Sequence, residues 1–190
     1  VQFRWITTLK TNLDWLFAED ETVFIAGDLL WYPTEGDNKK SQAPDVMVVF
    51  GRPKGERGSY QQWKEGNLAP QVVFEILSPS NTQAEMSRKL LFYERYGVEE
   101  YYIYDPQKNE LSGLMRGEMG LETLEEMNSW VSPRLKIRFE ITEPELKLYH
   151  PNGELFTSYT EEKQRAEQER QRAEKLANKL RELNINPDDL

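Results

Sequence analysis

The sequence predicts a mixed α/β domain followed by a charged helical tail. In roughly the first 159 residues, short apolar and β-branched runs typical of buried strands alternate with stretches of helical character. From residue 160 the composition changes to a run made almost wholly of Glu, Lys, Arg, Gln, Ala and Leu. We therefore expect one domain over residues 1–159 and a helical tail over residues 160–190, which suits a chain of this length.

The elements of the first half follow from local patterns. Residues 11–20 carry apolar side chains at spacings of three and four, which predicts a helix. Apolar runs over residues 22–31, 46–50 and 72–77, bounded by turn-forming residues, predict three strands. The polar interval of residues 52–70 is expected to be a loop, partly helical, or a functional lid. Its aromatic side chains either stack on nucleic acid or pack within the loop.

A capped helix is predicted after the third strand. Thr82 and Glu85 form a capping-box sequence at its start, and Gly97 provides the stop. After this helix we expect another strand, a short antiparallel element and a hairpin, at residues 101–104, at residues 135–141, and at residues 146–149 with 154–156.

Acidic residues interrupt three of the apolar runs. Glu75 lies in the middle of the run Val-Val-Phe-Glu-Ile-Leu, and Asp45 opens another run after a proline. A buried carboxylate is costly unless it is compensated, and two on neighbouring strands also repel each other. A divalent cation such as Mg²⁺ between them would remove both penalties. Alternatively, Glu75 pairs with a buried Arg or Lys, or faces solvent on an edge strand. Asp28 is either a further acidic ligand or a residue at a β-bulge.

Composition excludes several other chemistries. The chain has no cysteine, which excludes disulfides and thiolate metal sites and fits a cytoplasmic location. Its one histidine, His150, stands in a turn-like Tyr-His-Pro-Asn-Gly stretch, so we expect a loop residue rather than a catalytic base. No apolar stretch approaches the roughly 20 residues that span a bilayer, so no membrane is expected as a partner. The net charge of −9 argues against a broad nucleic-acid-binding surface.

The order of the motifs resembles a known family. Pro44-Asp45-Val46 is followed by the Glu75 strand with its Ser-Pro-Ser end, then by Lys89 and Tyr93, and then by a Tyr-Gly-Val-Glu-Glu-Tyr-Tyr-Ile-Tyr-Asp-Pro run. Together these motifs resemble the Uma-type restriction endonucleases, a family of the PD-(D/E)XK nuclease superfamily, over roughly residues 5–150. The resemblance implies a restriction-endonuclease-like α-β-β-β-α-β core with a mixed sheet, extended here by antiparallel strands and a C-terminal helix.

The resemblance also implies a site. It places metal ligands at Asp45, at Glu75 and at the backbone carbonyl of Ile76, with Mg²⁺ or Mn²⁺ as the cofactor. Members of the superfamily carry a catalytic lysine two residues after the glutamate, where this chain has Leu77. The Uma-type pattern moves this role to the next helix, where Lys89 matches. The implied catalytic residues are therefore Asp45, Glu75 and Lys89.

A physical argument supports the position of Lys89. A strand, a short turn and a helix bring the helix back across the sheet, so one helical face can overlie Glu75. Lys89 and Tyr93 lie one turn apart, and a long lysine stem can run over an aromatic ring toward the carboxylates. The alternatives are an ordinary surface pair between Lys89 and Glu85, or Arg88 in place of Lys89.

The tail predicts a helix because residues 161–183 contain neither Gly nor Pro. A heptad assignment places Tyr159, Ala166, Ala173 and Leu180 at one core position, and Glu162, Glu169, Leu176 and Leu183 at the other. The seam is apolar only toward its end. The tail is therefore either a coiled coil that forms a homodimer or a solvated single helix held by charge pairs.

Taken with the resemblance, these features predict a Mg²⁺- or Mn²⁺-dependent endonuclease that hydrolyses DNA phosphodiester bonds as a homodimer. The alternative is a catalytically silent module with a nuclease fold that serves in binding or assembly. The acidic balance of the chain and its helical tail suit that alternative.

Overall fold

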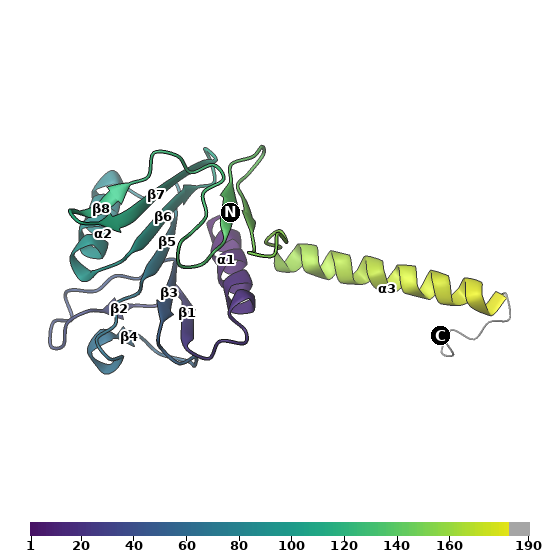
Figure 1. The fold of residues 1–190 in the computed structure, drawn as a ribbon, viewed down its shortest axis with the longest axis horizontal. Coiled ribbons are helices and arrows are strands. Elements are labelled where there is room, and N and C mark those ends of the chain that lie inside the picture. Colours follow the sequence, from purple (N-terminus) through teal and green to yellow (C-terminus); the bar gives the residue numbers. More distant parts are fainter. Residues whose placement is uncertain (183–190) are drawn as a thin grey trace. The chain divides into compact units, whose positions relative to one another are not determined.

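A six-stranded mixed sheet forms the centre of the first unit of the chain, Val1–Phe156 (Figure 1). The computed structural model describes residues 1–182. Strands β5 and β6 are parallel, and the other neighbouring strands are antiparallel. In sheet order the strands are β1 (Val23–Gly27), β3 (Val46–Phe50), β5 (Val72–Ile76), β6 (Glu100–Asp105), β7 (Glu110–Gly117) and β8 (Gly120–Thr123).

Helices and two small sheets complete this unit. They are α1 (Gln2–Leu16), α2 (Gln83–Tyr96), the 3-10 helix η1 (Gln62–Lys64), the parallel pair β2 (Trp31–Tyr32) and β4 (Tyr60–Gln61), and the antiparallel pair β9 (Arg138–Glu140) and β10 (Lys147–Tyr149). The order α1, β1, β3, β5, α2, β6 is the α-β-β-β-α-β core that the family resemblance implies, so the expected fold class is confirmed.

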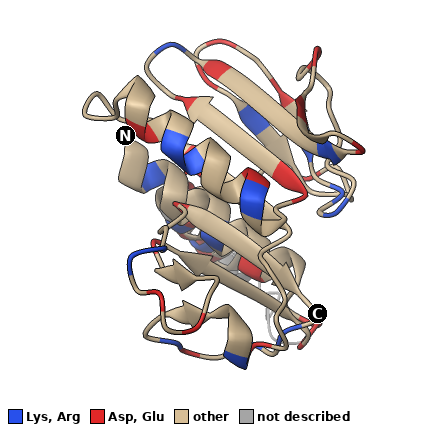
Figure 2. Ribbon diagram, turned by 90° about the vertical axis from the view of Figure 1, so that its left-hand side faces the viewer, with Lys and Arg blue, Asp and Glu red and all other residues tan. Residues whose placement is uncertain are grey.

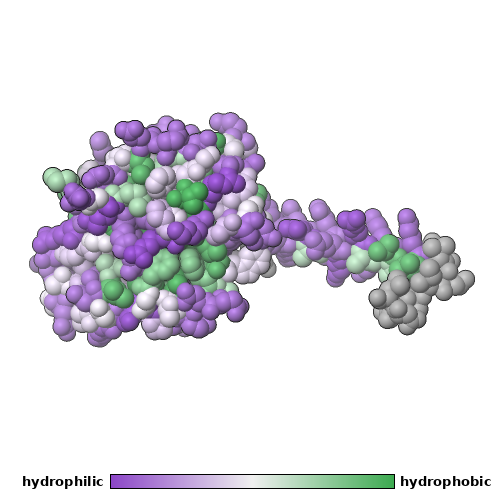
Figure 3. Space-filling model, viewed as in Figure 1, coloured by the Kyte–Doolittle hydropathy of each residue, from purple (hydrophilic) through white to green (hydrophobic). Residues whose placement is uncertain are grey.

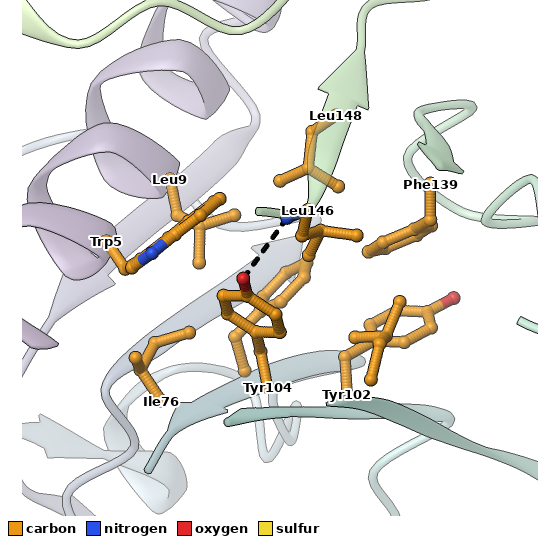
Figure 4. Close-up of a pocket in the computed structure, with 10 residues that line it drawn as sticks. Trp5, Leu9, Ile76, Tyr102, Tyr104, Phe139, Leu146 and Leu148 are labelled. Atoms are coloured by element: carbon orange, nitrogen blue, oxygen red, sulfur yellow. Dashed lines mark hydrogen bonds between the residues drawn. The ribbon is translucent and has the colours of Figure 1, made fainter. Parts of the chain in front are cut away.

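The central strands bury apolar side chains on both faces of the sheet, because successive residues of a strand point to opposite sides. One core cluster joins the sheet to α1 and to the small sheet of β9 and β10. Figure 4 shows a small apolar cavity in this cluster, where the Tyr104 hydroxyl accepts a hydrogen bond of 3.1 Å from the Leu146 backbone N–H. A second cluster lies on the opposite face and includes Trp31, Tyr93 and Tyr101.

Helix α2 begins and ends as its sequence predicts. Thr82 is the N-cap, and its hydroxyl oxygen accepts a hydrogen bond of 3.2 Å from the backbone N–H of Glu85. Gly97 ends the helix in the left-handed conformation, with a φ of 91°, which glycine adopts without steric cost. The Glu85 carboxylate accepts a hydrogen bond of 3.2 Å from the Asn81 side chain.

Two predicted boundaries in the first half are wrong. Helix α1 covers Gln2–Leu16 rather than residues 11–20, because Trp5, Leu9 and Leu13 continue the apolar stripe that packs on the sheet. The predicted strand over residues 22–31 ends at Gly27, since Asp28 adopts a φ of 49° that an extended strand does not allow.

The C-terminal elements agree with the prediction and add one pairing to it. The expected element at residues 135–141 is present as β9, and β10 pairs with it. Residues 154–156 turn back along β10 as the predicted hairpin, through the antiparallel bridge between Tyr149 and Leu155 and a hydrogen bond of 2.8 Å from the Phe156 N–H to the Leu148 carbonyl oxygen. His150 lies in this turn, as predicted, but it is buried, with its Nε2 atom 3.1 Å from the Asn12 side-chain oxygen. Packing of the ring against Phe156 explains that burial.

The second unit begins at Thr157 and contains helix α3 (Tyr159–Glu182), which agrees with the predicted tail helix. Its surface is mostly hydrophilic, with a hydrophobic spot toward the C-terminal end (Figure 3), and the Leu176 side chain is 61% exposed. The heptad position assigned to Leu183 lies outside the described residues. The coiled coil and the homodimer stay predictions. Within residues 1–182, no helix is long and apolar enough to cross a membrane.

Candidate active site

Glu75 is the centre of a buried polar cluster between the sheet and α2. It lies in β5 and is 2% exposed, because its strand is covered on both faces. The Lys89 Nζ atom lies 2.6 Å from Glu75 Oε2, and the Tyr93 hydroxyl donates to Glu75 Oε1 over 2.5 Å. Both donors come from α2 and are one turn apart on its inner face. Each carboxylate oxygen of Glu75 therefore has a hydrogen-bond donor from the helix.

Asp45 immediately precedes β3 and lies next to Glu75. In the antiparallel pairing of β3 and β5, Val46 is opposite Phe74, so continuing this register by one residue places Asp45 opposite Glu75. Alternation along the strands then directs the two carboxylates to the same face of the sheet. Asp45 Oδ2 accepts a hydrogen bond of 2.6 Å from the backbone N–H of Ile76. The three expected ligand positions thus meet at the end of two adjacent strands.

Burial of two carboxylates dominates the electrostatics of this cluster. Burial raises the pKa of Glu75 to about 7, an effect that Lys89 opposes and that the charge of Asp45 reinforces. Burial also raises the pKa of Asp45, against the Ile76 N–H and the Lys89 ammonium, which lower it. The single charge of Lys89 offsets only one of the two carboxylate charges. The site therefore keeps unbalanced negative charge when both carboxylates are ionised.

The structure distinguishes Lys89 from its alternatives. Lys89 is 8% exposed and pairs with Glu75, whereas Arg88 is exposed. Glu85, the other proposed partner of Lys89, contacts Asn81 instead. The geometry thus brings Lys89 to the carboxylates and leaves Arg88 outside the cluster.

Asp28 approaches the site through its backbone. Its N–H donates a hydrogen bond of 3.1 Å to the Asp45 carbonyl oxygen, so the β1–β3 pairing continues one step past the end of β1. The negative charge of Asp28 also raises the pKa of Asp45. Asp28 is therefore a neighbour of the cluster, and its left-handed φ explains why the strand ends there.

Gln2 is a further contact of the cluster, which the sequence pattern did not indicate. The Gln2 Nε2 atom donates a hydrogen bond of 2.7 Å to the Ile76 carbonyl oxygen, which is the expected third ligand. Gln2 opens α1, and the predicted helix began only at residue 11. The apolar spacing of Trp5, Leu9 and Leu13 was the signal that could have extended the helix toward Gln2.

Trp31 of β2 and residues of the polar interval 52–70 pack beside the site. Trp31 of β2 is fully buried, its ring lies parallel to that of Tyr93 at a centroid distance of 6.3 Å, and its Nε1 donates to Gln62 Oε1 over 2.9 Å. Tyr60 is also fully buried, and its hydroxyl donates to the Leu68 carbonyl oxygen. For Tyr60, packing within the loop is therefore the correct alternative, and stacking on nucleic acid is excluded.

The residues of the cluster fit a hard divalent cation. Asp45, Glu75 and the Ile76 carbonyl offer oxygen donors, which Mg²⁺ and Mn²⁺ prefer, and the pair of buried carboxylates carries charge that a cation would offset. In the part of the chain that the structure describes, no group of three or more His, Cys, Asp or Glu residues is arranged to hold a metal ion. The candidate ligand set therefore depends on the backbone carbonyl as well as on the two acids.

The order of the core elements is that of the restriction-endonuclease-like fold class. The model of the Uma2 family, described as putative restriction endonucleases, matches residues 4–142, and the chain belongs to this family. A crystal structure of a putative nuclease belonging to DUF820 from Anabaena variabilis is similar, with 18% identity and a TM-score of 0.48, covering 68% of this chain and 70% of that chain. None of the curated proteins compared matches the sequence significantly.

Proposed function

We propose that this protein is a Mg²⁺- or Mn²⁺-dependent endonuclease that hydrolyses phosphodiester bonds of DNA. The observation that carries the proposal is the buried pair of Asp45 and Glu75, for which Lys89 supplies the only cationic partner among the described residues. A purely structural ion pair would need one carboxylate, and a second buried carboxylate adds a desolvation cost that no second cationic side chain offsets. A divalent cation accounts for both.

The residues of the cluster have separate roles in this proposal. Asp45, Glu75 and the Ile76 carbonyl would hold the cation, which when bound lowers the pKa of a water molecule and offsets charge on the phosphate. Lys89 is held at the carboxylates by Glu75 and is largely desolvated, so its charge acts strongly on a phosphate group that enters the site. Tyr93 fixes the second oxygen of Glu75 and so limits the rotation of the carboxylate.

Binding of DNA must overcome the acidic balance of the chain. Figure 2 shows acidic and basic residues interspersed over the helices and loops. Because the net charge is −9, we expect affinity for DNA to depend on the metal ion and on local contacts rather than on a broad basic surface. In a homodimer, each subunit would present one site to one strand of a duplex.

The direct test combines metal binding with cleavage. Mn²⁺ affinity is measured by isothermal titration calorimetry, and nicking of supercoiled plasmid is measured with Mg²⁺, with Mn²⁺ and with EDTA. Asp45→Asn and Glu75→Gln keep the shape of the side chains but remove charge, so both should lose Mn²⁺ binding and nicking. Glu110→Gln, which changes an exposed acid on β7, is the matched control and should change neither.

Lys89→Ala separates binding of the metal from turnover. Removing the ammonium should lower the rate of nicking by more than it lowers Mn²⁺ affinity, because Lys89 does not ligate the metal in this proposal. A wild-type protein that binds Mn²⁺ but cleaves neither plasmid nor single-stranded DNA nor RNA would contradict the proposal. That result would favour the catalytically silent binding or assembly module.

A further inference from the structure

The side chain of Gln2, the first residue of α1, contacts the backbone of β5. Its Nε2 atom lies 2.7 Å from the carbonyl oxygen of Ile76, although the two residues are 74 positions apart in the chain. The amide of the same side chain also lowers the pKa of Asp45, so it lies near that carboxylate. One amide group thus binds one of the three oxygen groups expected to hold the metal and lies beside a second.

The partners of Gln2 determine which way its amide points. A backbone carbonyl oxygen can only accept a hydrogen bond, and a carboxylate has no hydrogen to donate when it is ionised. If the amide were rotated by a half-turn, Gln2 Oε1 would face these oxygens and be repelled. The NH₂ group therefore points to the site, and its partly positive hydrogens lie against the oxygens that a cation would contact.

We infer that Gln2 is an internal competitor for the metal site: its amide NH₂ group binds the Ile76 carbonyl oxygen, and it has to move away before a divalent cation can occupy the position in front of that oxygen. This inference rests on the metal site of the proposed function. Binding of the cation exchanges the hydrogen bond of Gln2 for metal–oxygen contacts, and the cost of breaking it lowers the apparent metal affinity. Gln2 therefore stabilises the metal-free form and makes occupancy depend on the concentration of the metal.

If Gln2 competes with the metal, its replacement should strengthen metal binding, whereas replacement of a metal ligand would weaken it. Gln2→Met keeps the length of the side chain but removes the NH₂ donor, so Mn²⁺ should bind more tightly than to the wild type. Loss of the one neutral hydrogen bond to the Ile76 carbonyl in the competing state corresponds to roughly two- to tenfold tighter binding. Gln2→Ala removes the same donor without introducing a thioether and should change affinity in the same direction.

Stability provides a second readout that does not involve cleavage. In EDTA, Gln2→Met should unfold at a lower temperature than the wild type, because the metal-free form has lost its hydrogen bond. At saturating Mn²⁺ this difference should disappear, since Gln2 makes no such contact in either protein. Phe3→Ala is the matched control: Phe3 neighbours Gln2 on α1 but is 80% exposed, so its loss should leave Mn²⁺ affinity unchanged.

Calorimetric titration of Mn²⁺ into the wild type, Gln2→Met, Gln2→Ala and Phe3→Ala is the deciding experiment. Tighter binding to both Gln2 variants, with Phe3→Ala unchanged, supports the inference even if plasmid is never nicked, in which case only the proposed endonuclease activity fails. Unchanged or weaker binding to the Gln2 variants overturns the inference, while wild-type nicking would still stand. Absence of Mn²⁺ binding in every protein overturns the inference and the metal site together.

Discussion

The Tyr93→Phe substitution tests whether the helix holds Glu75 through a hydrogen bond or only through packing. Tyr93 is fully buried, and its hydroxyl donates to Glu75 Oε1 over 2.5 Å. Tyr101 is a matched control on the neighbouring strand. It is also fully buried and its ring contacts that of Tyr93, but its hydroxyl has no hydrogen-bond partner among the described residues. Each substitution by Phe removes one oxygen atom and keeps the ring.

The two variants should differ in stability because only one hydroxyl is paired. A hydrogen bond to an ionised group contributes about 1.5–3 kcal/mol to the free energy of unfolding, so Tyr93→Phe should lose that amount when Glu75 is charged. Burial raises the pKa of Glu75 to about 7, so the carboxylate is mostly ionised at pH 8 and mostly protonated at pH 5.5. At pH 5.5 the loss should fall to about 0.5–1.5 kcal/mol. Tyr101→Phe should be neutral or slightly stabilising at both pH values.

The measurement is urea-induced unfolding, followed by circular dichroism in EDTA at pH 5.5 and pH 8 for the wild type and both variants. Equal effects of Tyr93→Phe and Tyr101→Phe at pH 8 would refute the reasoning, because the short contact to Glu75 would then contribute no free energy. A loss that is large but the same at both pH values would show that Glu75 does not ionise over this range.

Three further predictions concern the pH response, the core and the tail. The folded-state pKa of Glu75 is raised from 4.5 to about 7, so the wild type in EDTA should lose stability as pH rises through this window. Glu75→Gln lacks this loss, so its free energy of unfolding relative to the wild type should increase by on the order of 3 kcal/mol between pH 4.5 and 8. A difference in stability between the two proteins that stays constant over this range would contradict the raised pKa of Glu75. Trp5→Phe should change the free energy of urea unfolding by less than about 1 kcal/mol, since the buried Trp5 Nε1 has no hydrogen-bond partner within the described residues, whereas Leu9→Ala should cost about 2–5 kcal/mol. Truncation after Tyr159 should convert a homodimer to a monomer by light scattering; an unchanged dimer would place the interface on the domain, and a monomeric wild type would refute the dimer.

The sequence predicted those parts of the fold that local chemistry determines. Thr82 and Gly97 set the ends of α2 through a side-chain cap and a left-handed glycine, and both signals act within a few residues. The β5 strand was predictable because its run is apolar on both faces. The start of α1 and the end of β1 were not predicted. The first half of α1 is stabilised by packing on the sheet, and the left-handed conformation of Asp28 is not evident in an apolar run.

The candidate site shows the same division. Asp45 and Glu75 stand out in the sequence because an acid in an apolar strand is costly, and the order of motifs points to Lys89. Gln2, Trp31 and the hydroxyl of Tyr93 join the cluster through contacts between distant segments.

The sequence by itself determined the buried strand β5, the ends of α2 and the acids that interrupt the apolar runs, because period, capping and burial cost are local properties of a chain. Only the tertiary structure decided which strands are neighbours and therefore which polar groups meet. The register of β3 against β5 sets Asp45 opposite Glu75, and the return of α2 over the sheet brings Lys89 to the same carboxylate. Helix α1 brings Gln2 to the Ile76 carbonyl oxygen, although the two residues are 74 positions apart in the chain. The free energy of such contacts depends on distances of a few ångströms between residues far apart in sequence, and the fold sets those distances.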